Sequence, residues 1–309
     1  MRGCYVVSHK QIGDLILLEP SLRKLSLSFG CPVYVLTRSQ HRPLLNLMQH
    51  SKYIGGTPVT VAENLFAYDD LPKTALRSFL APSLKKTCLA IKTCRSAFWL
   101  PAVFQKVNCS IPDNEYLAKF FWKITPGVSH EQFSPPTLNQ PPKNWRPKQL
   151  QDDHPFILVN PTSGWRRKSW KPYGWVQVIE WLLRSTSVKI VITSGHLPWQ
   201  REHIMKISAK INNQRLAYLD YLSFENFLWI CSRASLVISV DGAAAHLASA
   251  FQVPSVTLFG PTNPIHWHFP TKTSISIMAP NNLNNKRLME SISADAVITA
   301  AEKLLNKIL

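Results

Sequence analysis

The sequence is poor in acidic residues and has neither paired cysteines nor a long apolar run. It holds 18 Asp and Glu against 35 Lys and Arg, a net charge of +17 over 309 residues. This excess predicts an anionic partner, namely nucleic acid, a membrane surface or a phosphorylated substrate. The six cysteines form no CxxC pair and no metal-ligand spacing, which indicates free thiols in a reducing cytosol.

Longer signals are missing as well. No apolar run reaches the length of a membrane span, and the first one is too short for a signal peptide. The dinucleotide fingerprint GxGxxG does not occur. The hydrophobic content of 45% is nevertheless enough for substantial buried cores, and the length suits two domains. We therefore expect a globular cytoplasmic protein.

Short apolar runs alternate with helical patterns in both halves of the chain. In the first half, strands are predicted at 4–8 and 32–37, with a helix over 15–29 between them. Pro20 lies inside that helical pattern, where it either kinks the helix or belongs to its first turn. The alternation resumes after the proline-rich segment 134–147, which we interpret as the interdomain linker.

This alternation predicts an α/β protein with two Rossmann-like, doubly wound domains that face a central cleft. We assign residues 1–145 to an N-terminal domain and residues 146–290 to a C-terminal domain. The amphipathic pattern over 291–309 predicts a last helix, which we expect to pack at the domain junction.

The most informative stretch is 236–262. An apolar strand leads into Asp241 at an N-cap position, and an alanine-rich helix follows. The free N–H groups and the dipole of such a helix attract an anion. Because Gly242 and Ala243 have almost no side chain, a phosphate can approach the backbone. With His246, the stretch predicts the floor of a site for a nucleotide-activated substrate; the alternative is a capped core helix with a satisfied histidine.

Three further groups suit the chemistry of a phosphorylated sugar. Thr162, Ser163 and Lys168 lie in a loop after an apolar strand, where hydroxyls and a cation suit a diphosphate leaving group. Glu202, early in a later helix, can bind the hydroxyl pair of a ribose or sugar. Asp14 lies in the other half, where a general base for an acceptor hydroxyl belongs. The simpler explanations are a basic surface loop, a carboxylate at a helix N-terminus and a helix cap, respectively.

Segment 71–112 differs in composition from the rest of the chain. It contains no Asp or Glu, and its cations alternate with large apolar side chains. Such a pattern suits a surface that meets an anionic amphiphile, where each cation contributes about 1 kcal/mol near an anionic leaflet. The alternative is that the apolar residues form sheet core and the cations a solvated face. The cations are Lys73, Arg77, Lys85, Lys86, Lys92, Arg95 and Lys106.

Taken together, these motifs resemble the lipopolysaccharide heptosyltransferases, glycosyltransferase family 9. Order and spacing match over nearly the whole chain, and residues 52–130 match least. The resemblance is carried by Gly13-Asp14 with Pro20, Lys168-Ser169-Trp170 with Trp175, Asp241 with His246, and Leu258-Phe259-Gly260-Pro261-Thr262.

The resemblance implies a GT-B fold and an inverting, metal-independent transfer from ADP-heptose, with no cofactor besides this donor substrate. It implies lipid A-core oligosaccharide as the acceptor. It also implies a peripheral protein at the cytoplasmic face of the inner membrane, in contact with the anionic inner-membrane surface. No nucleic acid partner is expected.

The resemblance also suggests roles by position. Asp14 is similar to the catalytic base of the family, and Lys168 to the lysine that meets the donor phosphates, with Thr162 and Ser163 nearby. Glu202 is similar to the carboxylate on the nucleoside. Asp241 and His246 are similar to the pair that holds the donor sugar and phosphate at the helix start.

One motif departs from the family pattern. The family usually has Asp-Thr-Gly where this chain has Asp241-Gly242-Ala243. The lost hydroxyl weakens the argument for the same donor sugar, and the added methyl narrows access to the backbone. Two alternatives therefore stay open: a family member that uses another nucleotide sugar, and a non-catalytic GT-B protein that binds a nucleotide or glycan. A nucleic-acid-binding protein is a third, suggested by the net charge alone.

Overall fold

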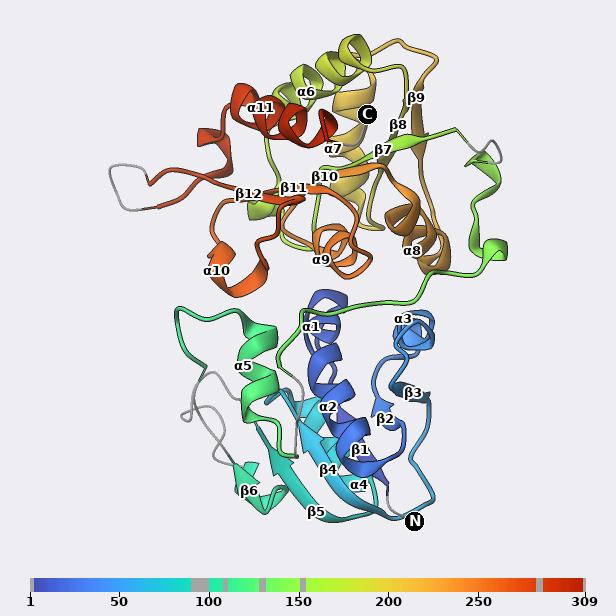
Figure 1. The fold of residues 1–309 in the computed structure, drawn as a ribbon, viewed down its shortest axis with the longest axis vertical. Helices are drawn as coiled ribbons and strands as arrows, with labels where there is room; N and C mark the ends of the chain where they lie inside the picture. Colours follow the sequence, from blue (N-terminus) through green and yellow to red (C-terminus); the bar gives the residue numbers. More distant parts are fainter. Residues whose placement is uncertain are drawn as a thin grey trace. The chain divides into compact units, whose positions relative to one another are not determined.

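The computed structural model describes residues 3–89, 100–107, 111–127, 132–150, 154–281 and 286–307. The chain folds into two compact units, Met1–Asn139 and Gln140–Leu309 (Figure 1). The division lies within the proline-rich segment that we interpreted as a linker, whereas our assignment put the boundary between residues 145 and 146.

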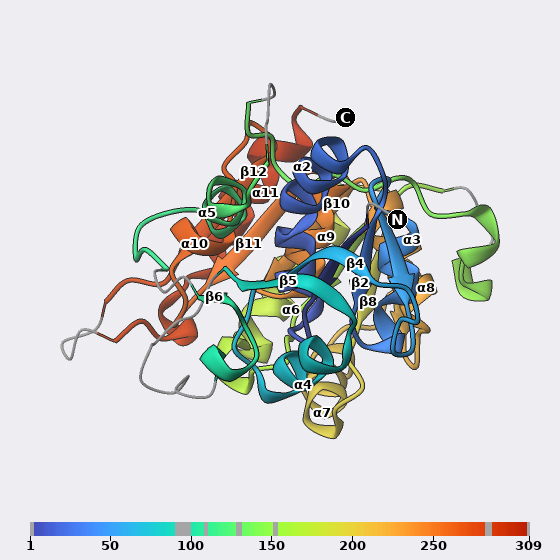
Figure 2. The same cartoon turned by 90° about the horizontal axis from the view of Figure 1, so that it is seen from below.

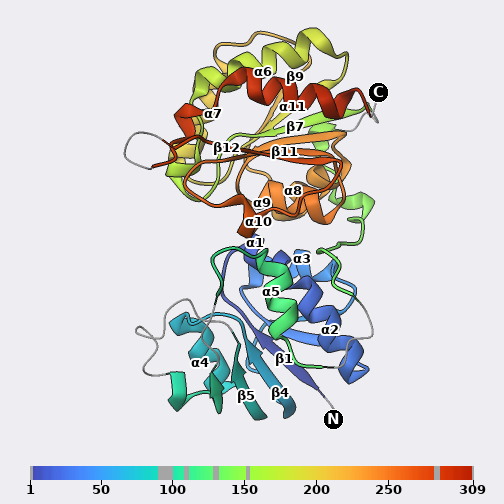
Figure 3. The same cartoon turned by 60° about the vertical axis from the view of Figure 1, so that its left-hand side comes forward.

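The first unit is built on a parallel sheet with the strand order β3-β2-β1-β4-β5-β6. Its strands are β1 Cys4–Val7, β2 Val33–Leu36, β3 Ser51–Ile54, β4 Ala62–Ala67, β5 Ser83–Cys88 and β6 Lys106–Val107. Its helices are α1 Ile12–Leu17, α2 Glu19–Phe29, α3 Arg42–Asn46, α4 Pro72–Leu80 and α5 Leu117–Ile124. Figure 3 shows α2 and α5 on one face of this sheet and α4 on the other. Because both faces are covered, the central strand β1 is buried throughout and is apolar along its length.

The second unit repeats this plan with the strand order β12-β11-β10-β7-β8-β9, again all parallel. Its strands are β7 Phe156–Asn160, β8 Lys189–Thr193, β9 Leu216–Leu219, β10 Leu236–Val240, β11 Ser255–Phe259 and β12 Ser274–Met278. Its helices are α6 Pro172–Ser185, α7 Pro198–Ser208, α8 Phe224–Arg233, α9 Ala243–Ala250, α10 Pro264–Trp267 and α11 Ala294–Leu305. Helices α6 and α11 cover one face, and α8 and α9 cover the other (Figures 1 and 3). The predicted α/β class with two Rossmann-like units is therefore confirmed.

Two predicted helix boundaries were wrong. The helix predicted over 15–29 starts earlier and is interrupted at Leu18, so that α1 and α2 are separate. Pro20 lies in the first turn of α2, which is one of the two positions we considered and one that costs no hydrogen bond. The N-cap of α9 is Gly242, not Asp241, and the Asp241 side chain bonds Lys168 in place of the helix start.

The last helix belongs to the core of the second unit. We expected the helix over 291–309 at the domain junction; its main contacts are with α6 and with strands β10, β11 and β12. The segment that leads into this helix is held in place by Trp170, which is fully buried and donates from Nε1 to the carbonyl of Ile292 at 3.1 Å. Trp170 also packs edge-on against the buried Trp175, with ring centroids 5.2 Å apart.

Membrane-spanning segments were searched for in the described ranges. No helix there combines the length and the apolar character that crossing a bilayer needs. Part of the cation-rich segment 71–112, including Lys92 and Arg95, lies outside the described residues.

The packing of Trp170 makes Gly174 a sensitive position. A Cβ atom there would lie 2.6 Å from Cη2 of the rigid indole, so Gly174→Ala forces the tryptophan or α6 to shift. We expect a loss of about 1–3 kcal/mol of unfolding free energy, seen as a drop of several degrees in Tm. Gly56→Ala is the matched control, because nothing lies within 4 Å of the added methyl. Equal Tm values for the two variants would contradict this account of the core.

Candidate functional site

Three loops meet at the carboxyl edge of the second sheet, where ligands collect in folds of this kind. They follow β7, β8 and β10, which are neighbours in the sheet. Gln200, at the start of α7, donates from Nε2 to the carbonyl of Ser163 at 2.8 Å. On the other side of the same loop, a Cβ atom on Gly242 would lie 3.0 Å from that of Ser163. The loop after β7 is therefore held between the starts of α7 and α9, and glycine at 242 allows this close approach.

A short ion pair lies at the centre of this edge. Lys168 Nζ lies 2.6 Å from Asp241 Oδ2, and Thr262 donates its hydroxyl to the same oxygen at 2.6 Å. The side chains of Asp241 and Lys168 are 3% and 15% exposed, so little water screens the pair. The contact joins the loops after β7, β10 and β11. The structure thus brings together Lys168 and Asp241, two residues that the sequence placed in one site.

Aromatic rings surround the lysine. Lys168 Nζ lies 5.1 Å from the ring centroid of Trp165 and 5.9 Å from that of Trp267, within the range of cation–π attraction. The ring of His246 packs edge-on against Trp267 with centroids 6.1 Å apart. Trp267 is therefore a common neighbour of His246 and Lys168. Sequence analysis did not identify Trp165 or Trp267, although both are close in sequence to predicted site residues.

The start of α9 offers donors to an anion. Asp241 and Gly242 precede a helix of eight residues, whose first N–H groups have no partner within the helix. Thr162 lies beside them after β7, and its buried Oγ1 has no hydrogen-bond partner in the described part of the chain. A buried hydroxyl without a partner is costly unless something else satisfies it. An oxygen of a phosphate or sugar is suited to that role.

His268 adds a neutral imidazole to this neighbourhood. Burial is the largest influence and lowers the pKa of His268, and the nearby His246 lowers it further. Ser274 and Asp241 act in the opposite direction but do not reverse the shift. His268 is therefore neutral at pH 7 and can accept as well as donate a hydrogen bond.

Glu202 has a different environment from the other predicted donor-site residues. Its carboxylate pairs with Lys206 at 2.6 Å on the surface of α7, and both side chains are 60% exposed. The hydrogen bond from Lys206 is the main reason why the pKa of Glu202 is lowered. A carboxylate that sequence analysis missed, Asp220, follows β9 directly; it accepts from Ser194 at 3.2 Å and pairs with Arg201 at 2.7 Å. The role of Glu202 stays a prediction.

Asp14 lies in the first turn of α1, in the first unit. Its Oδ2 accepts from the backbone N–H of Gln11 at 3.3 Å, so the carboxylate stabilises the helix start. The preceding loop is anchored by the buried Asp69, which accepts from the Ser8 hydroxyl at 2.9 Å and from the His9 N–H at 3.3 Å. Asp69 was not identified from the sequence. Nothing in its local pattern distinguishes it from a surface turn aspartate.

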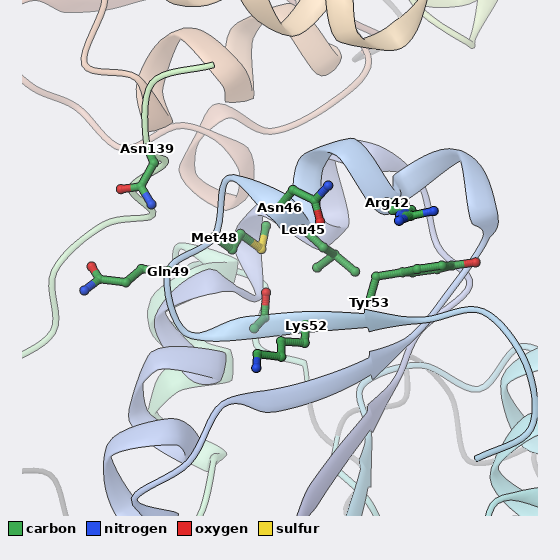
Figure 4. A pocket seen from close by; sticks show the side chains of 9 residues that line it. Arg42, Leu45, Asn46, Met48, Gln49, Lys52, Tyr53 and Asn139 are labelled. Carbon is green, nitrogen blue, oxygen red and sulfur yellow. The ribbon is translucent and has the colours of Figure 1, made fainter. Parts of the chain in front are cut away.

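The first unit also has a polar hollow of about 710 Å³ between α3 and β3. Figure 4 shows Arg42 and Tyr53 toward one end and Gln49 and Asn139 toward the other. The buried hydroxyl of Ser51 also lines it and has no partner among the described residues. The lining contains cations and amides and no carboxylate, which suits a polar or anionic ligand.

Metal-binding clusters were searched for in the same described ranges. No three His, Cys, Asp or Glu side chains come together there as a metal site. Metal independence of the reaction stays a prediction.

Comparison with known proteins identifies the family. The model of glycosyltransferase family 9 (heptosyltransferase) matches residues 115–296, which is more than half of the chain. The chain belongs to glycosyltransferase family 9. Among relatives, lipopolysaccharide heptosyltransferase 3 of Escherichia coli is 26% identical over 184 residues, which cover 55% of this chain and 54% of that protein. Lipopolysaccharide heptosyltransferase 1 of Pseudomonas aeruginosa is 31% identical over 115 residues, which cover 36% and 30%.

Solved structures of this family share the fold over the whole chain. Heptosyltransferase II of E. coli superposes with a TM-score of 0.82 at 15% identity and covers 99% of both chains. A family 9 glycosyltransferase from Veillonella parvula gives 0.85 at 16% identity, covering 99% of this chain and 98% of that one. The match in sequence is shorter: the chain spans about half the length of the E. coli relatives it matches.

For this family 9 protein, the ion pair itself can be tested for coupling. Lys168→Ala leaves the buried Asp241 carboxylate with Thr262 as its remaining side-chain partner, and we expect a loss of about 3 kcal/mol of unfolding free energy. Adding Asp241→Asn removes the uncompensated charge and should restore part of that loss. A double-mutant cycle by urea unfolding measures the coupling. Additive single-variant effects would mean that the two groups do not interact.

Proposed function

We propose that this protein transfers heptose from ADP-heptose to the inner core of lipopolysaccharide, with inversion at the anomeric carbon. The observation that carries the proposal is the Lys168–Asp241–Thr262 cluster at the start of α9. Family membership and an E. coli heptosyltransferase of the same fold, solved with ADP, support it. A second such structure of that enzyme contains ADP-2-deoxy-2-fluoro heptose.

The proposed reaction is a direct displacement. The acceptor hydroxyl oxygen bonds to the anomeric carbon as the bond from that carbon to the diphosphate oxygen breaks, and Asp14 takes the hydroxyl proton. The leaving ADP carries the electron pair of the broken bond. Its growing negative charge is stabilised by Lys168, by the hydroxyls of Thr162 and Ser163 and by the N–H groups at the start of α9.

Asp241 has a double effect in this scheme. Because it pairs with Lys168, the pair has no net charge, and an ammonium group retains two further N–H donors for phosphate oxygens. The exposed cations Arg166 and Arg167 in the same loop add positive charge. We propose that Asp241 and His246 hold the donor sugar and phosphate, that Gly242 and Ala243 supply backbone contacts, and that Glu202 binds the nucleoside.

The acceptor and location are part of the same proposal. The lipid A-core oligosaccharide would contact the first unit, whose polar hollow near Arg42 suits an anionic glycan. With such an acceptor the enzyme acts as a peripheral protein at the cytoplasmic face of the inner membrane. The sequence Asp241-Gly242-Ala243 favours one alternative, a family member that uses another nucleotide sugar.

The donor can be tested by thermal shift. ADP-heptose at saturating concentration should raise Tm by several degrees, since a ligand at 100 times its Kd contributes about 2.7 kcal/mol. The UDP-, GDP- and CMP-sugars should raise it less. The Lys168→Ala variant serves as the control and should lose most of the shift relative to its own baseline. Stronger stabilisation by a nucleotide sugar whose base is not adenine would show that ADP-heptose is not the donor.

The base can be tested by turnover. Asp14→Asn should keep the thermal shift with ADP-heptose but lower the rate of ADP release about 10²–10⁴-fold with a lipid A-core acceptor. Asp295→Asn is the matched control, because Asp295 is also a first-turn carboxylate, in α11. Unchanged turnover in Asp14→Asn would exclude Asp14 as the base. Nucleotide binding without any transfer by the parental protein would identify a non-catalytic binder.

A further inference from the structure

Helix α4 buries small side chains and exposes its large apolar ones, which is the reverse of an ordinary surface helix. A surface helix normally turns its apolar side chains toward the core and its polar ones toward water. In α4 the buried residues are Thr74, Ala75 and Ser78. Ser78 donates its hydroxyl to the Thr74 carbonyl at 2.7 Å, and the Thr74 hydroxyl lies 3.5 Å from Nδ1 of His9. The large apolar residues of this helix therefore lie on the side away from the sheet.

Four large apolar side chains make up this outer face. Leu76 is 60% exposed, Phe79 62% and Leu80 49%, and Leu84 at the start of the next strand is 66% exposed. Figures 2 and 3 show α4 and β5 next to each other on the outside of the first unit. Isolated exposed leucines need no explanation, but a cluster on one helix and the adjoining strand indicates a binding surface.

Cations border the same side chains. Lys86 donates to the Phe79 carbonyl at 3.0 Å and lies 5.9 Å from the centre of its ring. Lys73 is exposed, on α4. Arg77 is one helical turn from Lys73 and donates to the carbonyl of Gly56 at 3.1 Å. No Asp or Glu occurs between residues 71 and 112 to neutralise them.

We propose that this face, made of Leu76, Phe79, Leu80 and Leu84 with Lys73, Arg77 and Lys86, is a docking surface for an anionic lipid bilayer. The apolar side chains insert among the acyl chains, while the ammonium and guanidinium groups meet the lipid phosphates. The arrangement of large apolar groups bordered by cations of one sign is complementary to such a surface. The inference rests on the proposed location at the inner membrane and adds the surface that makes the contact; it needs no assumption about the sugar donor.

A second copy of the chain does not fit the same face. A two-fold interface places each patch against its own copy, so the cations on one face would meet the same cations on the other. With no carboxylate in segment 71–112 to pair with them, that contact is repulsive. An anionic bilayer removes the conflict because its charge is opposite in sign.

Vesicle binding by the full chain tests the docking surface. The parental protein should co-sediment with phosphatidylcholine vesicles that contain phosphatidylglycerol, and much less with phosphatidylcholine alone. Leu76→Ser with Phe79→Ser should weaken this partitioning about tenfold or more. The matched control is Leu27→Ser with Met205→Ser, whose side chains are 52% and 58% exposed and lie outside the proposed surface. That control should bind like the parental protein.

Double charge-reversal variants test the electrostatic contribution to vesicle binding. Lys73→Glu with Lys86→Glu should reduce binding to the anionic vesicles about tenfold, whereas Lys119→Glu with Lys303→Glu makes the same net charge change elsewhere and should have a much smaller effect. Circular dichroism confirms that each variant is folded.

Equal losses in proposed-surface and control variants would overturn the proposal, as would absence of parental binding to anionic vesicles. Self-association lost in Leu76→Ser with Phe79→Ser would assign the face to a second copy instead.

Transfer in a lipid-free assay keeps this test separate from the proposed function. With a delipidated, water-soluble core oligosaccharide as acceptor, Leu76→Ser with Phe79→Ser should retain parental ADP release. Failure of vesicle binding with intact transfer refutes only the docking surface. Loss of transfer in this assay would instead show that the α4 face acts in the reaction and would overturn its assignment to lipid.

Discussion

The second unit depends on the contact between Lys168 and Asp241, because it joins three loops at one edge of the sheet. Thr262 completes the contact, so the segments after β7, β10 and β11 share one carboxylate oxygen. A buried carboxylate is tolerated only when such partners are present. Under the proposed function, the same cation and helix start would also meet the donor diphosphate. Local stability and phosphate recognition would then rest on the same few atoms.

Much of the fold followed from sequence pattern, for a physical reason. Buried parallel strands such as β1 and β10 are continuous apolar runs, and the chain between them has helical period, so the α/β class was predictable. The helix starts were less predictable: the pattern over 15–29 continues across the break at Leu18, although Pro20 just after it cannot donate a helical hydrogen bond. Asp241 is a residue type that often caps helices, but its carboxylate bonds Lys168, a partner 73 residues away in sequence.

The site was predictable to the extent that its residues follow strands directly. That rule selected Thr162, Ser163 and Asp241, and their roles in binding stay predictions. Trp267 and Gln200 were missed because their contributions arise from packing against other loops. The outer face of α4 illustrates the opposite case: the sequence showed interleaved cations and apolar residues, but only the structure shows that the small polar side chains point inward. Which face of a short helix is buried is decided by the sheet on which it packs.

The hydrogen bond from Trp170 to Ile292 has a consequence for how the protein is made. Trp170 is two residues from Lys168, and its indole is fixed by the segment that leads into α11. During synthesis, the loop that contains Lys168 emerges more than a hundred residues before this segment. The strands of both sheets would then have been made while Trp170 still lacks its partner at Ile292. The Lys168 loop would reach its final position only after the segment that leads into α11 has left the ribosome and packed against Trp170.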